Sequence, residues 1–247
     1  MRKILIFLFV VLLSVISIVL LGSYKKAIAP STTISLVKKE ILQSSKEPFY
    51  KVSVAQPVLE GMLNKNSQNE VNASINAVIT NVIDQFKKEV ATNKVVFKFP
   101  NPSSLTITYE VSRVDNKIIS ILFEVSDYTA GQAHPTNYAL PFNYNVTTKK
   151  AILLSDMFNK NFDYLKMLSV ISAKDLREQY KKEGNNYDIF VTDGTSPKLE
   201  NFQKFILTKS SLIIIFDPAQ VGPYVEGIKK VQIPLNSISS QLNTQNI

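Results

Sequence analysis

The 247-residue sequence predicts an α+β fold, in which helices pack on one face of an antiparallel β-sheet, preceded by one N-terminal transmembrane helix. Three observations predict it. The chain begins with a long apolar run. A later segment has an apolar stripe at helical spacing, and in several other segments apolar and polar residues alternate with period two. Strands that cluster as hairpins, with helices before and after them, are typical of the α+β class.

The N-terminal run, Ile4–Leu21, has 18 residues and is flanked by basic residues. As a helix it would span about 27 Å, close to the thickness of a bilayer core. Ala27–Ala29 resemble a signal-peptidase site, but Pro30 follows, and we expect it to block cleavage. We therefore predict a signal anchor over residues 1–24 of a single-pass cell-membrane protein whose C-terminal domain lies outside. The alternative is secretion after signal cleavage.

Residues 25–46 are polar, and we interpret them as a stalk. After them, Tyr50, Val52 and Val54 share one face of a predicted strand, and Pro57 should end it.

A helix is predicted next, because apolar residues recur every three or four positions along one stripe. Its members are Val71, Ile75, Val78, Ile79, Val82, Ile83, Phe86 and Val90. Ser67 and Glu70 have the spacing of a capping box at its start.

A β-hairpin follows over residues 105–125, with the turn at Asp115-Asn116 and apolar residues at every second position on both sides. Another strand is predicted over residues 137–146. A helix follows over residues 162–184, for which Ser155 or Asp156 could supply a cap. The last strands are predicted at residues 205–208, 212–216 and 230–233.

Composition limits the chemistry. There is no Cys, His134 is the only His, and the net charge of +8 is dispersed without a basic patch interleaved with aromatics. A zinc site takes two or more His or Cys ligands, and no Gly-x-Ser-x-Gly nucleophile motif accompanies the histidine. We expect no cofactor, no metal and no nucleic-acid partner. An enzyme is not the favoured reading, although paired carboxylates for glycoside cleavage stay open.

Several short motifs resemble a known family. Pro57, Leu59 and Gly61 precede a helix that carries Asn76, and later come "DYTAGQAHPTNY", "NYNVTTKKAILLSDMF" and "LIIIFDPAQVGPYVEGIKKVQIPL". This order resembles a family of extracytoplasmic domains of unknown function. They are found in the outer part of lysozyme-binding anti-sigma factors and N-terminal to peptidoglycan (polysaccharide) deacetylase domains.

The resemblance implies a deacetylase-N-terminal-like subdomain over residues 47–130 and a lysozyme-sensor-like subdomain over residues 131–240, packed as one unit. The sequence departs from the family pattern at Gln132, at Lys149 in place of a turn glycine, and at Ala219 in place of an aromatic.

The function that we expect is a non-catalytic, membrane-anchored binding or sensing module at the cell wall, with peptidoglycan or a lysozyme-like protein as partner. The candidate ligand-binding residues are Tyr128, His134, Tyr138 and Tyr224, which lie in predicted loops or where a loop meets a strand. His134 precedes Pro135, and for this residue we favour packing or hydrogen bonding at the start of a strand over a ligand contact. A cryptic cell-wall glycan hydrolase or deacetylase, and a structural envelope protein, are the alternatives.

Overall fold

The computed structural model describes residues 33–93 and 101–243. The predicted membrane segment Ile4–Leu21 lies outside these residues. Within the described ranges, no helix combines the length and the apolar character that crossing a membrane requires.

A six-stranded sheet contains β1 (Ser35–Lys46), β2 (Phe49–Glu60), β3 (Ser103–Val114), β4 (Ile118–Tyr128), β5 (Thr136–Asn145) and β6 (Lys150–Ala151), in that order. All neighbours are antiparallel except β2 and β3, which pair in parallel over Tyr50–Val54. A parallel pair needs a crossover, and the long helix α2 (Lys65–Thr92) lies in the connection between β2 and β3. The sheet is therefore mixed rather than purely antiparallel.

A second, three-stranded antiparallel sheet consists of β7 (Phe205–Leu207), β8 (Ser211–Phe216) and β9 (Lys229–Pro234). Helices α3 (Tyr164–Lys182) and α4 (Asp188–Gly194) accompany it. Short 3-10 turns complete this part of the chain: η1 (Leu154–Met157), η2 (Leu199–Phe202), η3 (Tyr224–Glu226) and η4 (Leu235–Gln241).

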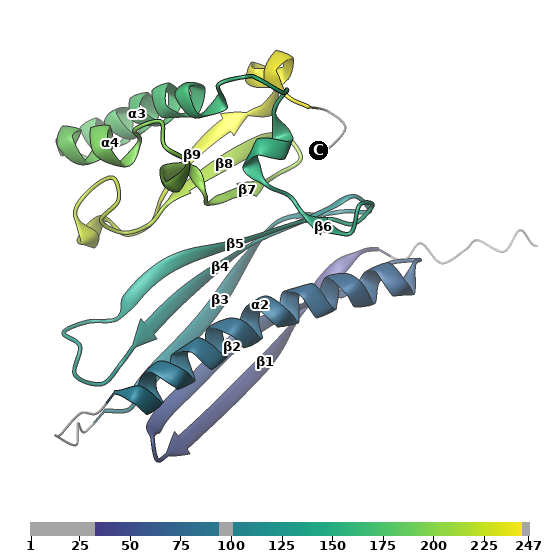
Figure 1. Cartoon of the computed structure of the whole chain (residues 1–247), viewed down its shortest axis with the longest axis vertical. Coiled ribbons are helices and arrows are strands. Elements are labelled where there is room, and N and C mark those ends of the chain that lie inside the picture. The colour runs from purple at the N-terminus through teal and green to yellow at the C-terminus, as the bar shows by residue number, and fades with distance from the viewer. Residues whose placement is uncertain (1–32, 94–100, 244–247) are drawn as a thin grey trace, which may run out of the picture. The chain divides into compact units, whose positions relative to one another are not determined.

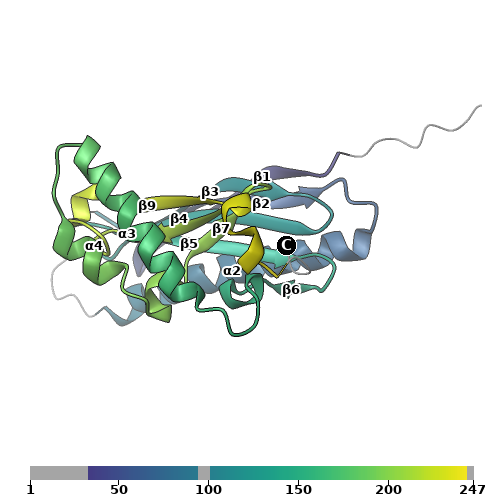
Figure 2. The same ribbon diagram turned by 90° about the horizontal axis from the view of Figure 1, so that it is seen from above.

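The two sheets pack face to face, with helices on their outer faces (Figures 1 and 2). Alternation along β4 shows this directly. Ile121 and Phe123 lie in one core with the apolar stripe of α2, whereas Leu122 packs with Ile206 and Ile215 of the second sheet. On the far side of that sheet, residues of β8 and β9 share a core with α3. The expectation of helices on one face of a single sheet is thus corrected to two sheets, each with its own helical layer.

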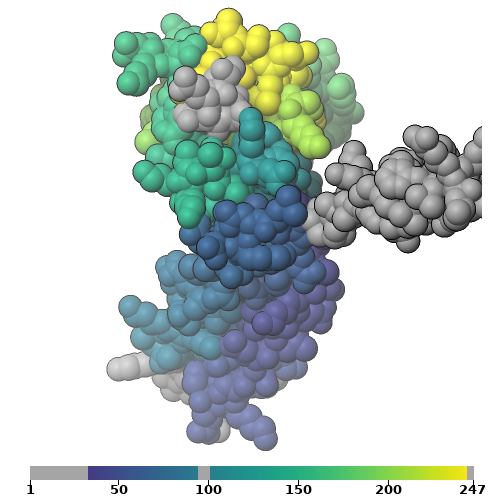
Figure 3. All heavy atoms as spheres, turned by 90° about the vertical axis from the view of Figure 1, so that its right-hand side faces the viewer, coloured from purple at the N-terminus to yellow at the C-terminus, as the bar shows by residue number. Residues whose placement is uncertain are grey.

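The predicted stalk is wrong for Ser35–Lys46, which form β1 and pair with β2 along its whole length. β1 is an edge strand whose residues are mostly exposed, so its composition is polar (Figure 3, purple). Pro57 does not end β2 either. Because β3 pairs with β2 only over Tyr50–Val54, a residue without an N–H is tolerated further along β2.

Helix starts also differ from the expectation. The side chain of Asn64, not a Ser67–Glu70 box, caps α2 by accepting a hydrogen bond from the N–H of Ser67 at 3.0 Å. Asp163 caps α3, whereas Ser155 and Asp156 belong to η1.

Two features bear on the family resemblance. Lys149 adopts a φ of 58°, the left-handed conformation that the turn glycine of the resembled family would adopt without strain. β5, although it lies beyond residue 130, pairs with β4 in the first sheet. The division into subdomains at that residue stays a prediction.

Candidate functional site

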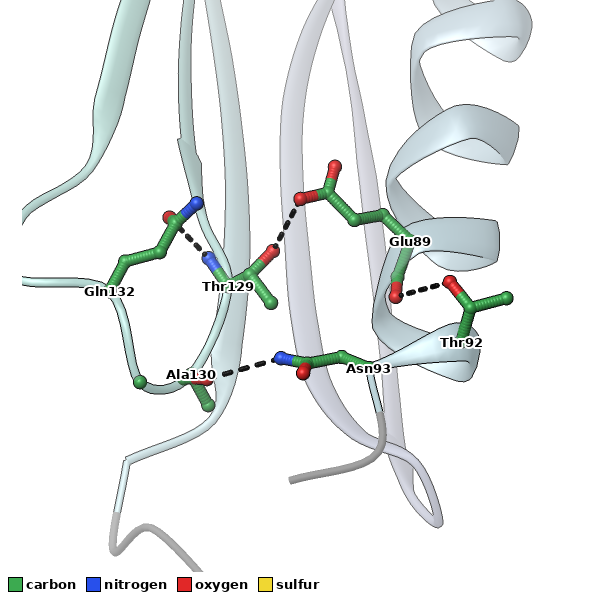
Figure 4. A pocket seen from close by; sticks show the side chains of 7 residues that line it. Glu89, Thr92, Asn93, Thr129, Ala130 and Gln132 are labelled. Carbon is green, nitrogen blue, oxygen red and sulfur yellow. Dashed lines mark hydrogen bonds between the residues drawn. The ribbon is translucent and has the colours of Figure 1, made fainter. Parts of the chain in front are cut away.

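A polar cavity of about 540 Å³ lies where the C-terminal end of α2 faces the loop that follows β4 (Figure 4). Its walls are polar side chains and loop backbone: Glu89, Thr92, Asn93, Thr129, Ala130, Gly131 and Gln132. These residues come from segments nearly 40 positions apart, and the fold brings them together because the C-terminal end of α2 lies against the loop that follows β4.

Hydrogen bonds fix the loop to the helix (Figure 4). The hydroxyl of Thr129 donates to a carboxylate oxygen of Glu89 at 3.3 Å, and the side-chain amide of Asn93 donates to the carbonyl of Ala130 at 3.3 Å. Within the loop, the N–H of Thr129 donates to Oε1 of Gln132 at 3.0 Å, and Gly131 supplies a φ of 102° for the turn. The cavity is open to solvent, but these bonds hold its loop wall in a defined conformation against the end of α2.

A smaller compartment of about 270 Å³ adjoins the first and shares Glu89 and Gln132 with it. Its lining is Val82, Gln85, Phe86, Glu89, Asp127, Gln132, Thr136 and Tyr138. Asp127 reaches it because β4 side chains alternate: Ile119, Ile121, Phe123 and Val125 face the α2 side, and Asp127 is the next position on that face.

The electrostatics of this compartment are unusual. Burial, and then the nearby Glu89 carboxylate, raise the pKa of Asp127 to about 6. Burial, followed by the charge of Asp127, also raises the pKa of Tyr138. Perturbed acids that line a cavity are a physical indicator of a functional site.

His134 and Tyr224 are brought together, but as parts of a structural junction. Their ring centroids are 4.9 Å apart. The Tyr224 hydroxyl donates to the Pro135 carbonyl at 2.9 Å and accepts from the Asn137 N–H at 3.0 Å. His134 Nδ1 lies 3.0 Å from the same carbonyl. These contacts favour packing and hydrogen bonding at the start of β5 for His134.

Tyr224 works with Asp217 to cover the free edge of β5. A carboxylate oxygen of Asp217 accepts from the Ala139 N–H at 2.9 Å, two residues beyond Asn137, and the next position on that edge is Pro141, which has no N–H. Asp217 is in turn ion-paired with Lys204. The loop over residues 217–224 therefore supplies hydrogen-bond acceptors for the free N–H groups at this edge of β5.

The four predicted ligand-binding residues do not form one site. Tyr138 lines the smaller compartment, His134 and Tyr224 form the junction, and Tyr128, which alternates with Asp127 along β4, points to the other face. Sequence reasoning missed Glu89, Asp127 and Thr129. One signal was available: Asp127 occupies a position that the apolar alternation of β4 assigns to the core-facing side.

Among the described residues, no group of three or more His, Cys, Asp or Glu side chains could hold a metal ion. A larger cavity of about 800 Å³ between α2, β5 and η2 has mostly apolar walls. Lys149, the charged residue among the described residues that line it, is paired with Glu70 at 2.8 Å. The polar pocket is the better candidate, because it offers hydrogen-bonding groups and, in its smaller compartment, the Asp127 carboxyl, which is not ion-paired with any described residue.

Fold and pocket together define a mixed α+β module with a cavity lined by polar residues at one end of its larger sheet. Comparison with known families then confirms the resemblance: residues 43–137 match the family described as "Deacetylase PdaC", and residues 155–236 match "Protein of unknown function (DUF3298)".

Relatives with known names cover the chain to different extents. The peptidoglycan-N-acetylmuramic acid deacetylase PdaC of Bacillus subtilis is 27% identical over 145 residues, which are 59% of this chain but 30% of the deacetylase. The anti-sigma-V factor RsiV of the same organism is 25% identical over 90% of this chain and 72% of its own length. The immunogenic protein MPT64 of Mycobacterium tuberculosis is 23% identical over 79% of each chain.

Solved structures support the fold. A DUF3298 family member from Bacteroides fragilis aligns with a TM-score of 0.63 at 13% identity, over 86% of this chain and 95% of that one. A DUF3298 protein from Pseudomonas aeruginosa aligns with a TM-score of 0.58 at 12% identity, over 86% and 94%.

Proposed function

We propose that this protein is a non-catalytic, membrane-anchored binding module that acts outside the cytoplasm at the cell wall, with the polar pocket as its ligand site. The observation that carries the proposal is the cavity whose walls present the Thr92 and Thr129 hydroxyls, the Asn93 and Gln132 amides and the Glu89 carboxylate. Hydroxyl and amide groups that converge on a cavity suit a ligand rich in hydroxyls and amides. Peptidoglycan glycan is such a ligand.

The position of the pocket supports this role. Helix α2 has 28 residues and is about 42 Å long. The pocket lies at its C-terminal end, whereas Ser35, at the start of β1, pairs with Glu60, close to the N-terminal end of α2 (Figure 1). A tether that enters at Ser35 would leave the pocket at the far end of the sheet, accessible to an extended polymer.

The relatives support the setting. One is named as a peptidoglycan deacetylase and another as an anti-sigma factor. The anchor over Ile4–Leu21 would place the module in that setting. A lysozyme-like protein is the second partner class, which the family resemblance suggests.

Co-sedimentation of the full-length chain, in detergent, with purified peptidoglycan sacculi tests the proposal. We expect the wild type to sediment with sacculi and Gln132→Ala, which removes an amide from both compartments, to bind at least five-fold more weakly. Asn116→Ala, an exposed change in the β3–β4 turn at the other end of β4, is the matched control and should bind as the wild type does.

The same preparation should be tested for lysozyme capture and for release of muropeptides or acetate. Capture of lysozyme without binding to sacculi would mean that the ligand is a lysozyme-like protein and not peptidoglycan. Release of either product would mean that the pocket belongs to an enzyme, and binding to neither partner would end the proposal.

A further inference from the structure

The smaller compartment contains a carboxyl group that the protein leaves without a hydrogen bond. Asp127 is about half-buried, and among the described residues no donor lies within hydrogen-bonding distance of its carboxyl oxygens. Glu89 faces it from α2 and repels its charge. Partly buried carboxylates are normally paired or hydrogen-bonded, and the described residues around this compartment supply no positive group that compensates Asp127.

No Lys or Arg is among the described residues that line either compartment. Lys204, which reaches the ring of Tyr138 with its ammonium 5.6 Å from the ring centroid, is already paired with Asp217. The remaining walls are the rings of Phe86 and Tyr138 and the side chains of Gln85 and Thr136. An aromatic wall next to carboxylates is favourable for a cation, because the ring face attracts positive charge.

From this cavity we infer that the pocket binds a glycan with a free amino group. The ammonium would lie in the smaller compartment between Asp127, Glu89 and the Tyr138 ring, and the sugar hydroxyls would contact the larger one. The inference rests on the proposed function and deepens it, since it selects de-N-acetylated amino sugars over their acetylated forms. An acetamido group is neutral, so it would leave the two carboxylates uncompensated and would add a methyl group beside them.

The larger compartment favours a glycan over a protein lysine as the carrier of the ammonium. A lysine side chain reaches its charge through four methylene groups, which are best accommodated by an apolar channel. The larger compartment instead presents Thr92, Asn93, Thr129 and Gln132. These groups match hydroxyls that lie directly beside the amine on a sugar ring.

The charge state of the pocket agrees with this assignment. Burial and Glu89 raise the pKa of Asp127 to about 6, so Asp127 is mostly ionised near pH 7, and a bound ammonium would stabilise its charged form further. The other titratable groups on the packed elements are Tyr138 of β5, which is neutral at this pH, and the Lys204–Asp217 pair, whose charges oppose each other.

Titration calorimetry of the full-length chain in detergent tests the inference with two oligosaccharides that differ only in acetylation. One probe is the β-1,4 tetramer of glucosamine, and the other is the same tetramer of N-acetylglucosamine. At pH 7 and 150 mM salt we expect at least ten-fold tighter binding of the free amine. The net charge of the chain is +8, which disfavours non-specific attraction of a polycation.

The substitution Asp127→Asn should lower the ratio of the affinities for the glucosamine and N-acetylglucosamine tetramers at least ten-fold. Glu124→Gln should leave this ratio unchanged. Glu124 is an exposed carboxylate on the same strand and is the matched control. Circular dichroism and thermal unfolding would establish that both variants are folded. Equal affinity for the two tetramers, or a preference that persists in Asp127→Asn, would overturn the inference.

The failure of this inference is distinguishable from that of the proposed function. If neither tetramer binds but sacculi still do, the assignment of the ammonium is wrong and the wall-binding role stands. If sacculi do not bind either, both fall. A third probe is lysine amide acetylated on its α-nitrogen, which keeps the free side-chain ammonium. If it binds as tightly as the glucosamine tetramer, the glycan assignment is wrong and a protein partner is indicated.

Discussion

Asp127 is the residue whose environment opposes its charge most clearly. It continues the core-facing series of β4 yet carries a carboxyl, which burial and Glu89 disfavour in ionised form. Such a residue lowers the stability of the fold, and natural proteins commonly retain that loss where function requires it. Its effect on stability is therefore measurable apart from any ligand.

We predict that Asp127→Asn stabilises the protein at pH 8 and has little effect at pH 3.5. The folded-state pKa of about 6 lies above the ordinary value of 3.8, so the folded protein binds the proton more tightly. The penalty is absent below about pH 4, grows up to about pH 6, and is complete above it. Because the group is half exposed, solvent screening reduces the expected gain to about 1 kcal/mol.

Urea unfolding at the two pH values measures this difference, and Glu124→Gln serves as the exposed control. A gain that is the same at both pH values would show that the carboxylate charge is not its cause.

Alanine substitutions at two glycines test two different causes of destabilisation, a steric clash at one and backbone strain at the other. A Cβ on Gly194 would lie 2.0 Å from the carbonyl oxygen of Gln220 and 2.9 Å from Cγ1 of Val221. A Cβ on Gly184 would meet nothing within 4 Å, but its φ is 77°. We predict that Gly194→Ala destabilises the protein by about 3 kcal/mol through overpacking, and Gly184→Ala by about 1 kcal/mol through left-handed strain alone. Chemical unfolding of both variants checks the order, and equal losses would contradict it.

At the scale of elements, local pattern predicted most helices and strands. The stripe of α2 and the alternation of β3 were read correctly, because each buries one face. The strand β4 was also predicted, but with one buried face, whereas Ile118–Phe123 are buried on both faces. β1 was missed since an edge strand with exposed residues has a polar sequence. The seven-residue α4, in which Val191 and Gly194 are the buried residues, has too few turns to show a periodicity.

The candidate site was predicted only in part for the same reason. Tyr138 was named, but Glu89 and Asp127 meet only because the end of α2 lies beside the end of β4. No local pattern specifies that meeting. Likewise, the parallel pairing of β2 with β3 depends on the path of the crossover rather than on the composition of either strand.

The covered edge of β5 gives a prediction for Tyr224. Tyr224→Phe removes the donor to the Pro135 carbonyl and the acceptor for the Asn137 N–H. Because the site is partly exposed, water can replace part of these two hydrogen bonds. We therefore expect a loss of about 1 kcal/mol in the free energy of unfolding. Tyr128→Phe, which removes a hydroxyl that makes no hydrogen bond to the described residues, should be neutral. Thermal unfolding of the pair checks this, and equal stability of the two variants would refute an edge-capping role.

At the scale of the whole described unit, a buried polar link joins the two sheets. The Ser120 hydroxyl donates to Oδ1 of Asn143 at 2.7 Å and accepts from the Leu207 N–H at 2.8 Å. The amide of Asn143 donates to the Phe205 carbonyl at 2.7 Å. The first bond joins β4 to β5 within the larger sheet, and the other two cross to β7 of the smaller sheet, so the link specifies how the sheets align.

We predict that Ser120→Ala costs about 2 kcal/mol, because it leaves a buried N–H and a buried amide oxygen without partners. Ser126→Ala, on the same strand but only partly buried, is the control and should change stability little. Denaturant unfolding measures both. A Ser120→Ala variant as stable as the control would mean that the sheets are aligned by apolar packing alone.

The Ser120–Asn143–Phe205 link bears on how such modules can be exchanged between proteins. Ser120 lies in the segment that matches one family model, Phe205 lies in the segment that matches the other, and Asn143 falls between the two. A graft that moved either segment alone would leave buried polar atoms without hydrogen-bond partners at the apolar interface between the sheets. The two segments should therefore be inherited, expressed and engineered as a single piece, cut no closer than the outer ends of β1 and η4.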